Sequence, residues 1–282
     1  MNKKGLIVIS VITIICTFFV ACNKANKRNN SKQDNELQGR QELLSCIVIG
    51  VDESGKQIDS IMIASLNYSD ETVSVLAVPS DIRCVKEKYA NMITSNNLEK
   101  IVGDISAACN IDVDKYIVLT LETVSSILSE FGNITFDIPD LYGDGVGMVY
   151  DDNIQNLHIS LSPGRHKLTP EEMMHVIRYI KGNLNSEGRR ATYDNGEIDR
   201  LYMQQSLIKS IFEQKSKILE DTNVLSIIKT FPSKLKTNLT SKDIVEAYKL
   251  ISNIEVADIF LKTMQGQYLD DGYIKYFEPQ IQ

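Results

Sequence analysis

The stretch CIVIGVDESGKQIDSIMIASLNYSDETVSVLAVPSD, residues Cys46–Asp81, holds three apolar runs separated by polar turns. The first run, Cys46–Val51, is continuous and β-branched, which is typical of a strand buried on both faces. The other two runs, Ser60–Leu66 and Thr72–Val78, flank the sequence NYSDE, which has the composition of a turn. The stretch therefore predicts a central strand followed by a β-hairpin.

Carboxylates mark the ends of these runs. Asp52 closes the first run, Asp59 opens the second, and Asp81 follows the third after Pro79. In an antiparallel hairpin the start of one strand lies beside the end of the next, so we expect Asp59 and Asp81 to converge at one edge of the sheet. Two converging carboxylates can hold a hard cation such as Mg²⁺. The alternative is that both are ordinary turn residues, because aspartate is a common turn former.

Composition narrows the class of protein. The chain has 282 residues, 43% of them apolar, which allows one large domain or a domain with appendages. Its net charge of −7 argues against a nucleic-acid partner held by phosphate contacts. The five cysteines form no CxxC motif, and no Cys/His cluster has zinc spacing, so neither a disulfide scaffold nor a zinc site is predicted.

The N-terminus has the pattern of an export signal. Lys3 and Lys4 precede an apolar run that ends at Cys22. The residues Phe19-Val20-Ala21-Cys22 resemble a bacterial lipobox, in which the cysteine is lipidated; the alternative is an uncleaved signal anchor. In both cases residues 1–22 tether the protein to the outer face of a membrane, and the polar residues 23–42 form a flexible linker.

Strands and helices then alternate, which points to an α/β layered domain. Residues Ile82–Asn97 read as a loop. The spacing of apolar residues predicts a helix over Leu98–Ala108, a strand over Tyr116–Leu121, a helix over Thr123–Phe131 stopped by Gly132, and a strand over Ile134–Ile138. The Gly- and Asp-rich segment Tyr142–Asn156 lacks the residue order of an EF-hand and is interpreted as a long surface loop.

Two further helices follow. Thr169, Pro170 and Glu172 form a capping-box start for a helix that ends near Gly182. The polar segment Asn183–Gly196 reads as a mobile loop. Glu197 begins the second helix, on which Arg200 and Gln204 share a face, being four residues apart. The segment 215–282 carries amphipathic pieces over Lys242–Ile251 and Val256–Met264 and is interpreted as a helical extension without a catalytic motif.

Blocks of this sequence, taken together, resemble the LytR-CpsA-Psr family of bacterial cell-envelope proteins. IGVDESGKQIDSIMIASLN is similar to a family block with G-x-D followed by R-S/T-D-S/T, and VLAVPSD to the I/L-P-R-D block. IDVDKYIVLTLETVSSILSEFGNITFDIP resembles the middle block of a strand, a helix and a strand ending in proline. PGRHKLTPEEMMHVIRYIKG and EIDRLYMQQSLIKSIF resemble the last two blocks, the second of which reads D-x-G-R-x-x-R-Q. The resemblance covers about Leu44–Phe212 in unbroken order.

The resemblance implies an α-β-α layered domain with a mixed central sheet over residues 43–214, facing the outside of the cell. Family members bind a polyprenyl pyrophosphate and transfer its glycopolymer, such as teichoic acid or capsule, to peptidoglycan. The new link is a phosphodiester, and Mg²⁺ assists. The implied partners are therefore the lipid-linked glycopolymer, peptidoglycan and the membrane, but no nucleic acid.

Carried over residue by residue, the family pattern implies catalytic and metal-binding roles for Asp59 and Asp81. It implies phosphate binding by Arg178, Arg200 and Gln204. The alternatives are that the two aspartates are turn residues, that the two arginines do not face the site, and that Gln204 is a plain helix-surface residue. Family arginines are replaced at four matched positions, namely Gln57, Ser80, Ile180 and Met203. Since each charged hydrogen bond is worth roughly 1.5–3 kcal/mol, we expect weakened pyrophosphate binding. Arg83, Lys181, Arg189 or Arg190 could replace the lost charges.

Three functions agree with these residues. The first is a divergent glycopolymer transferase, favoured by the retained aspartates. The second is a non-catalytic member that binds polyprenyl lipid or wall glycan, favoured by the lost arginines. The third is a regulatory envelope protein, although the sequence shows neither a DNA-binding helix nor a basic face.

Overall fold

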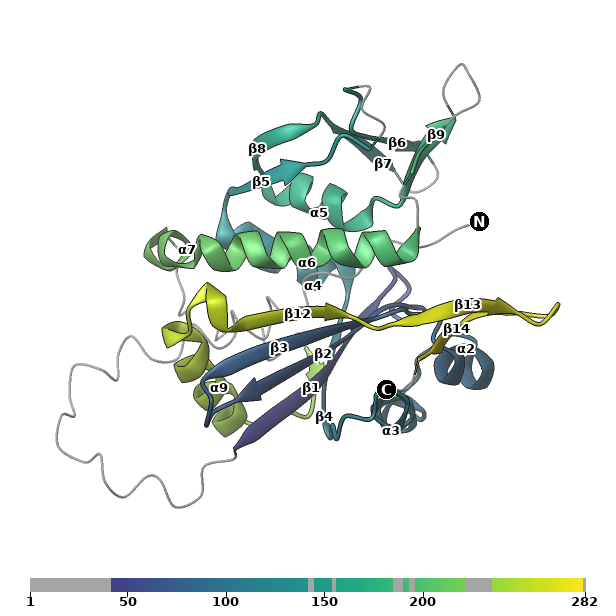
Figure 1. Cartoon of the computed structure of the whole chain (residues 1–282), viewed down its shortest axis with the longest axis vertical. Coiled ribbons are helices and arrows are strands. Elements are labelled where there is room, and N and C mark those ends of the chain that lie inside the picture. The colour runs from purple at the N-terminus through teal and green to yellow at the C-terminus, as the bar shows by residue number, and fades with distance from the viewer. Residues whose placement is uncertain are drawn as a thin grey trace.

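The centre of the protein is a six-stranded mixed sheet (Figure 1). The computed structural model describes residues 42–141, 145–153, 156–184, 190–192, 196–221 and 235–280. The strands stand in the order β11 (Lys236–Thr237), β4 (Lys115–Leu119), β1 (Leu43–Val51), β2 (Ile58–Asn67), β3 (Thr72–Val78) and β12 (Ile259–Thr263). Strand β1 runs antiparallel to β2 and parallel to β4, and β12 runs parallel to β3. The predicted α/β class with a mixed central sheet is confirmed.

The predicted central strand and hairpin are both present. Side chains of β1 alternate between two apolar clusters, with Cys46 and Val48 in one and Ile47 and Ile49 in the other. This strand is therefore buried on both faces, as its continuous apolar run indicates. Strands β2 and β3 form the hairpin, and the side-chain oxygen of Asn67 accepts hydrogen bonds from the backbone of Ser69 and Asp70, each 3.0 Å long.

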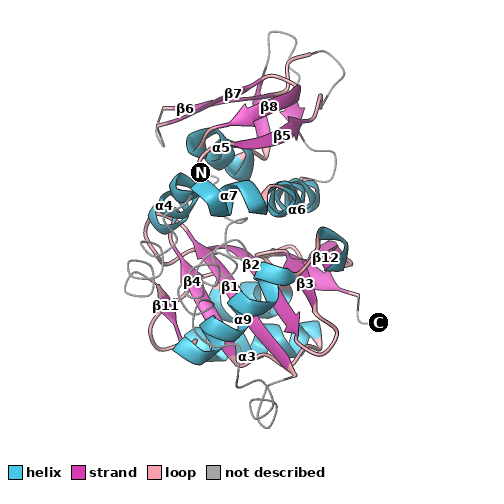
Figure 2. Ribbon diagram, turned by 90° about the vertical axis from the view of Figure 1, so that its left-hand side faces the viewer, coloured by secondary structure: helices cyan, strands magenta, loops and turns pink. Residues whose placement is uncertain are grey.

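Helices cover both faces of the sheet (Figure 2). One apolar cluster joins the sheet to α4 (Leu121–Phe131), α5 (Pro170–Arg178), α6 (Glu197–Glu213) and α9 (Ser241–Asn253). The other joins it to α2 (Arg83–Tyr89) and α3 (Leu98–Cys109). Helix α7 (Lys215–Asp221) follows α6. Two small strand pairs, β5–β8 (Ile134–Ile138, Gly164–Leu168) and β6–β7 (Met148–Asp152, Leu157–Leu161), lie beyond α5 and α6 (Figures 1 and 2).

Local capping signals fix several of these helices. Thr169 accepts a hydrogen bond from the backbone N–H of Glu172, and the Glu172 carboxylate accepts one from the backbone N–H of Thr169, so the predicted capping box is present. Gly132 follows α4 with a φ of 66°, which suits glycine and ends the helix where the sequence predicts.

Three predicted loops contain regular structure. Helix α2 lies within Ile82–Asn97, and strand β6 lies within Tyr142–Asn156. Helix α5 ends at Arg178 because Tyr179 is already extended, and β9 (Lys181–Leu184) pairs with β10 (Arg190–Thr192) where a mobile loop was expected. These elements are short and rich in polar residues. A short element has too few residues to show a clear apolar period, so the periodicity of the sequence does not predict it.

The segment 215–282 contains strands as well as the predicted helix over Lys242–Ile251. Strands β11 and β12 are the two edge strands of the central sheet, and β13 (Gly266–Asp270) pairs with β14 (Lys275–Pro279). The piece Val256–Met264, which was expected to be helical, forms the short helix η1 (Val256–Asp258) and then β12. A short apolar run fits either a helix or a strand, and here the open edge of β3 decides the outcome.

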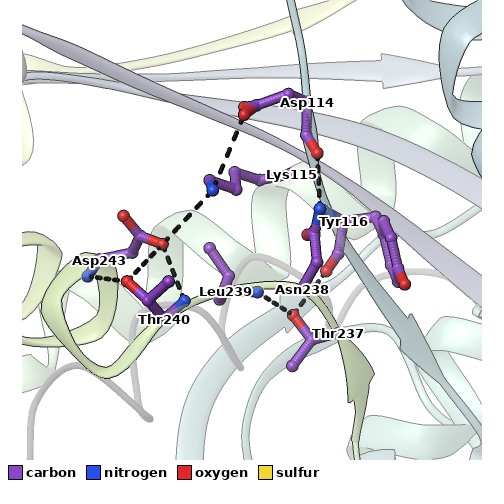
Figure 3. Close-up of polar contacts among 8 residues, drawn as sticks. All are labelled: Asp114, Lys115, Tyr116, Thr237, Asn238, Leu239, Thr240 and Asp243. Atoms are coloured by element: carbon purple, nitrogen blue, oxygen red, sulfur yellow. Dashed lines mark hydrogen bonds and ion pairs between the residues drawn. The ribbon is translucent and has the colours of Figure 1, made fainter.

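A polar cluster attaches the C-terminal segment to β4 (Figure 3). Thr237 donates a hydrogen bond from its hydroxyl to the backbone oxygen of Tyr116 at 2.6 Å, and Asn238 exchanges bonds with Tyr116 and Asp114. A capping box of Thr240 and Asp243 then starts α9. These contacts cover the edge of β4, which would otherwise expose unpaired backbone groups.

Residues 1–41, with Cys22 and nearly all of the polar linker, lie outside the described residues. Within the described ranges no helix is both long and apolar enough to cross a membrane.

Candidate functional site

Asp59 and Asp81 lie at the same end of the central sheet. Asp59 is the second residue of β2, and Asp81 follows the end of β3. Ile61 pairs with Val78 across the hairpin, and continuing this register brings Asp59 opposite Ser80, the neighbour of Asp81. Both aspartates are only 6% exposed, so they are more deeply buried than is usual for a charged residue.

Asp52, by contrast, closes the turn between β1 and β2. One of its carboxylate oxygens accepts hydrogen bonds from the Ser54 hydroxyl at 2.5 Å and from the backbone N–H of Gln57 at 3.1 Å. Its backbone N–H also donates to the Gln57 carbonyl at 2.9 Å. These contacts give Asp52 a structural task in shaping the turn that leads into Asp59.

Arg200 is completely buried at the start of α6, close to Asp59. Its Nη2 forms an ion pair with Glu197 and donates to the backbone oxygen of Asp59 at 3.5 Å. The other two guanidinium nitrogens, Nε and Nη1, have no hydrogen-bond partner among the described residues, and neither does the second carboxylate oxygen of Glu197. A buried donor without a partner is costly, so these nitrogens indicate a place for an anion.

Gln204 lies one turn further along α6 and is also completely buried. Its side-chain nitrogen donates to the backbone oxygen of Ile177, in α5, at 3.1 Å. Its side-chain oxygen has no partner among the described residues. Gln204 therefore connects α6 to α5, and its side-chain oxygen, one helical turn from Arg200, can accept a further hydrogen bond.

Arg178, the last residue of α5, is half-buried. Burial lowers the pKa of its guanidinium, and the negative charges of Glu53, Asp152 and Asp59 oppose that shift. A guanidinium stays charged under all ordinary conditions, so Arg178 adds a fixed positive charge in the field of Asp59. The structure thus brings Asp59 within electrostatic reach of both arginines that the sequence singled out.

Tyr268, in β13, completes this group of residues. Its hydroxyl donates to a carboxylate oxygen of Asp81 at 3.1 Å. Burial raises the pKa of Tyr268, the charges of Asp81 and Glu197 raise it further, and Arg200 partly offsets them. The phenol therefore remains a hydrogen-bond donor, and it lies within the combined field of Asp81, Glu197 and Arg200.

Sequence reasoning missed Tyr268 and the pairing of Glu197 with Arg200. Tyr268 lies 187 residues from Asp81 along the chain, outside the sequence blocks that carry the resemblance. A signal was present nevertheless: in QYLDDGYIKYF an Asp-Gly pair separates two apolar runs, which is typical of a β-hairpin. That signal predicts the strand pair but not its contact with Asp81.

The carboxylate oxygens at this end of the sheet are of the type that binds a small hard cation. Mg²⁺ is usually held by one or two carboxylates, with substrate phosphates and water filling the remaining positions. Asp59 and Asp81 match this chemistry, and no group of three or more His, Cys, Asp or Glu side chains within the described residues offers a complete protein cage.

The four positions at which the resemblance implies a lost arginine differ in how far they are buried. Ser80 is only 4% exposed, and its backbone oxygen accepts a hydrogen bond from Asn91 at 3.0 Å. Gln57 and Ile180 are half-buried, and Met203 packs against the large apolar cluster.

Two of the cations that could replace the lost charges are Arg83 and Arg189. Arg83 forms exposed ion pairs with Glu87 and Glu278, and Arg189 lies outside the described residues.

An apolar cavity of about 350 Å³ lies beside the second half of α6. It is formed by α6, η1 and β12 and lined by Lys209, Phe212, Val256, Ala257, Ile259 and Leu261. Lys209 comes nine residues after Arg200, which on a rise of 1.5 Å per residue is roughly 13 Å along the helix.

Comparison with known proteins places these features in a family. The sequence matches the LytR_cpsA_psr family over residues 12–282, which includes the strands of the C-terminal segment. The chain belongs to the LytR-CpsA-Psr family.

Individual relatives of this LytR-CpsA-Psr protein are distant. An uncharacterised Staphylococcus aureus protein is 22% identical over 92% of the chain, which spans 63% of that relative. The Bacillus subtilis polyisoprenyl-teichoic acid–peptidoglycan teichoic acid transferase TagV is 20% identical over 91% of the chain, which spans 64% of its length. The chain thus spans less than two thirds of both relatives. A solved structure of TagT bound to LIIa-WTA shares the fold, with a TM-score of 0.59 at 16% identity, covering 85% of this chain and 86% of that one.

Proposed function

We propose that this protein transfers a glycopolymer of teichoic acid or capsule type from a polyprenyl pyrophosphate to peptidoglycan at the outer face of a membrane. The observation that carries the proposal is the buried guanidinium of Arg200: its Nε and Nη1 have no hydrogen-bond partner among the described residues, while its Nη2 donates to the backbone oxygen of Asp59. A pyrophosphate is an anion that such a group can bind, since arginine grips phosphate oxygens with two parallel hydrogen bonds. The names of the family's teichoic acid transferases support the same reaction.

The reaction would proceed by direct displacement at phosphorus. A hydroxyl oxygen of peptidoglycan forms a bond to the phosphorus that carries the glycopolymer. The bond from that phosphorus to the bridging oxygen breaks, and polyprenyl phosphate leaves with the electron pair. The proton of the attacking hydroxyl passes to the carboxylate of Asp59 or Asp81, the buried acceptors at this end of the sheet.

Charge stabilisation would come from the protein and from a cation. Arg178 and Arg200 offset the negative charge that accumulates on the phosphate oxygens, and Gln204 orients the group. Asp59 and Asp81 would hold Mg²⁺, which when bound neutralises part of the pyrophosphate charge.

The lipid part of the substrate needs an apolar site. The cavity beside α6 has apolar walls apart from Lys209, and α6 connects it to Arg200. We propose that the cavity receives part of the isoprenoid chain of the substrate.

The substitutions at the matched positions imply a weakened transferase. Ile180 and Met203 cannot bind phosphate, and Glu197 already occupies one nitrogen of Arg200. These features also favour a second function, in which the protein binds polyprenyl lipid or wall glycan without transferring it.

One assay separates the two functions. The full-length chain in detergent is mixed with a polyprenyl-pyrophosphate-linked oligosaccharide, peptidoglycan fragments and Mg²⁺, and both lipid binding and the phosphodiester product are measured. Slow product formation that Arg178→Gln abolishes supports the transferase. Binding without product supports the second function, and the absence of both contradicts both.

A further inference from the structure

The hairpin of β13 and β14 is attached to the loop that carries Asp81 by two independent contacts. The backbone N–H of Phe277 donates to the backbone oxygen of Asp81 at 2.9 Å, and the Tyr268 hydroxyl donates to its carboxylate at 3.1 Å. Ile82, the next residue, forms a parallel bridge with Phe277. The hairpin therefore contacts both the backbone and the carboxylate of Asp81.

The ring of Tyr268 is held in place without help from its hydroxyl. Tyr268 pairs with Phe277 across the hairpin, and their rings meet edge to face with centroids 5.4 Å apart. The ammonium of Lys275 lies 5.2 Å from the centre of the Tyr268 ring. Gly266 permits this close packing, because a Cβ there would lie 2.6 Å from the Phe277 ring and 2.2 Å from the backbone oxygen of Glu278.

We propose that Tyr268 is a positioning residue, which orients the Asp81 carboxylate for its work in the active site. The proposal rests on the proposed function, in which Asp81 binds Mg²⁺. A carboxylate can rotate about its bond to the chain, and a fixed donor on one oxygen restricts that rotation and sets the direction of the other oxygen. Partners of this kind commonly change metal affinity by about 10–100-fold when removed.

The contact could instead serve only to hold the hairpin, and this alternative makes a different prediction. A purely structural hydrogen bond would affect the unfolding temperature and leave metal affinity unchanged in the folded protein. A positioning bond would affect metal affinity and turnover number, while the KM for the lipid substrate, which depends on Arg178 and Arg200, would stay the same.

The decisive experiment compares Tyr268→Phe with the parent chain. The substitution removes the hydroxyl and retains the ring contacts with Phe277 and Lys275. Mg²⁺ binding to the full-length protein without substrate is measured by calorimetry, together with the unfolding midpoint and transfer kinetics. We expect the Kd for Mg²⁺ to rise about tenfold, kcat to fall and KM to remain unchanged.

Tyr276→Phe is the matched control. Tyr276 is a buried tyrosine of the same hairpin, and its ring faces Arg83, with the guanidinium 5.2 Å from the ring centre. It should bind Mg²⁺ like the parent. Equal Mg²⁺ affinity in Tyr268→Phe, Tyr276→Phe and the parent would overturn the proposal.

A double-mutant cycle distinguishes an effect of Tyr268 through Asp81 from an indirect effect through a loss of stability. If Tyr268 acts through Asp81, then adding Tyr268→Phe to Asp81→Asn should change Mg²⁺ affinity no further. Additive effects would mean that Tyr268 acts elsewhere and would overturn the inference. A parent that binds Mg²⁺ but transfers nothing contradicts the proposed transfer alone, since metal affinity still decides the role of Tyr268. A parent that does not bind Mg²⁺ overturns the inference.

Discussion

The carboxylate of Glu197 contacts the guanidinium of Arg200, three residues later on the same helix, and both are almost excluded from solvent. The protein thus supplies an internal anion to the cation that is expected to bind phosphate. An arriving pyrophosphate would have to share Arg200 with Glu197, and repulsion between the two anions would weaken binding.

Replacing Glu197 with glutamine should therefore tighten the binding of polyprenyl pyrophosphate, because it removes a negative charge and retains an oxygen for Arg200. The same change should lower the unfolding midpoint, since a buried arginine loses its counter-ion. Lipid binding and thermal unfolding check both effects. Glu213→Gln, at the exposed end of the same helix, is the control and should change neither. Weaker lipid binding in Glu197→Gln would show that Glu197 takes part in recognition.

Arg178→Gln should weaken lipid binding by about tenfold or more, because a charged hydrogen bond to phosphate contributes roughly 1.5–3 kcal/mol. Its effect on stability should be small, since Arg178 is only half-buried. Arg165→Gln, an exposed arginine on β8, should bind the lipid like the parent. Binding isotherms for the three proteins test this, and equal affinities would exclude Arg178 from the phosphate site.

Restoring arginine at Gln57 and Ile180 should tighten lipid binding and speed transfer. Both positions are half-buried, so we expect them to accept a longer side chain, whereas Ser80→Arg should destabilise the fold because Ser80 is 4% exposed. Each single change should give less than half of the combined gain, since residues that act on one anion are not additive. Binding and transfer assays decide this. A parent that already turns over as fast as a family member with all its arginines would refute the weakened site.

The anchor can be tested by labelling cells with a lipid precursor. Cys22→Ala should abolish labelling if Cys22 lies in a lipobox. Labelling that persists in the variant, or is absent from the parent, would instead favour an uncleaved signal anchor.

Acid should weaken the fold through His175. Burial lowers the pKa of this histidine from its ordinary value of 6.5, Arg178 and His158 push it the same way, and Glu171 and Glu172 oppose them. A depressed pKa means that the unfolded chain binds the proton more readily, so stability is lost as the pH falls below about 6.5. The unfolding midpoint should drop from pH 7.5 to pH 5.5, and His175→Gln should reduce that drop. An unchanged drop would assign the acid sensitivity to other groups.

The sequence predicted those features that depend on neighbours along the chain. The β2–β3 hairpin, the capping box at Thr169 and the stop at Gly132 all follow from local turn and capping chemistry. Strand β12 could not be predicted, because the open edge of β3 determines its conformation.

In the candidate site, too, the sequence predicted some features and missed those that depend on distant parts of the chain. The family resemblance pointed to Asp59, Asp81, Arg178, Arg200 and Gln204, and the structure shows that the first two share one end of the sheet. Full burial of Arg200, its pairing with Glu197 and the contact of Tyr268 with Asp81 arise from packing between distant segments. No spacing rule in the sequence contains that information.

The attachment of the last hairpin to Asp81 also governs when the site can form during folding. The two residues that meet are separated by 187 positions, and β12 must first pair with β3 for the hairpin to reach its place. Contacts between such distant residues form slowly, because the long intervening chain must be ordered before they can add stability. We therefore expect the Asp81 side of the candidate site to assemble late in folding, after the central sheet has formed.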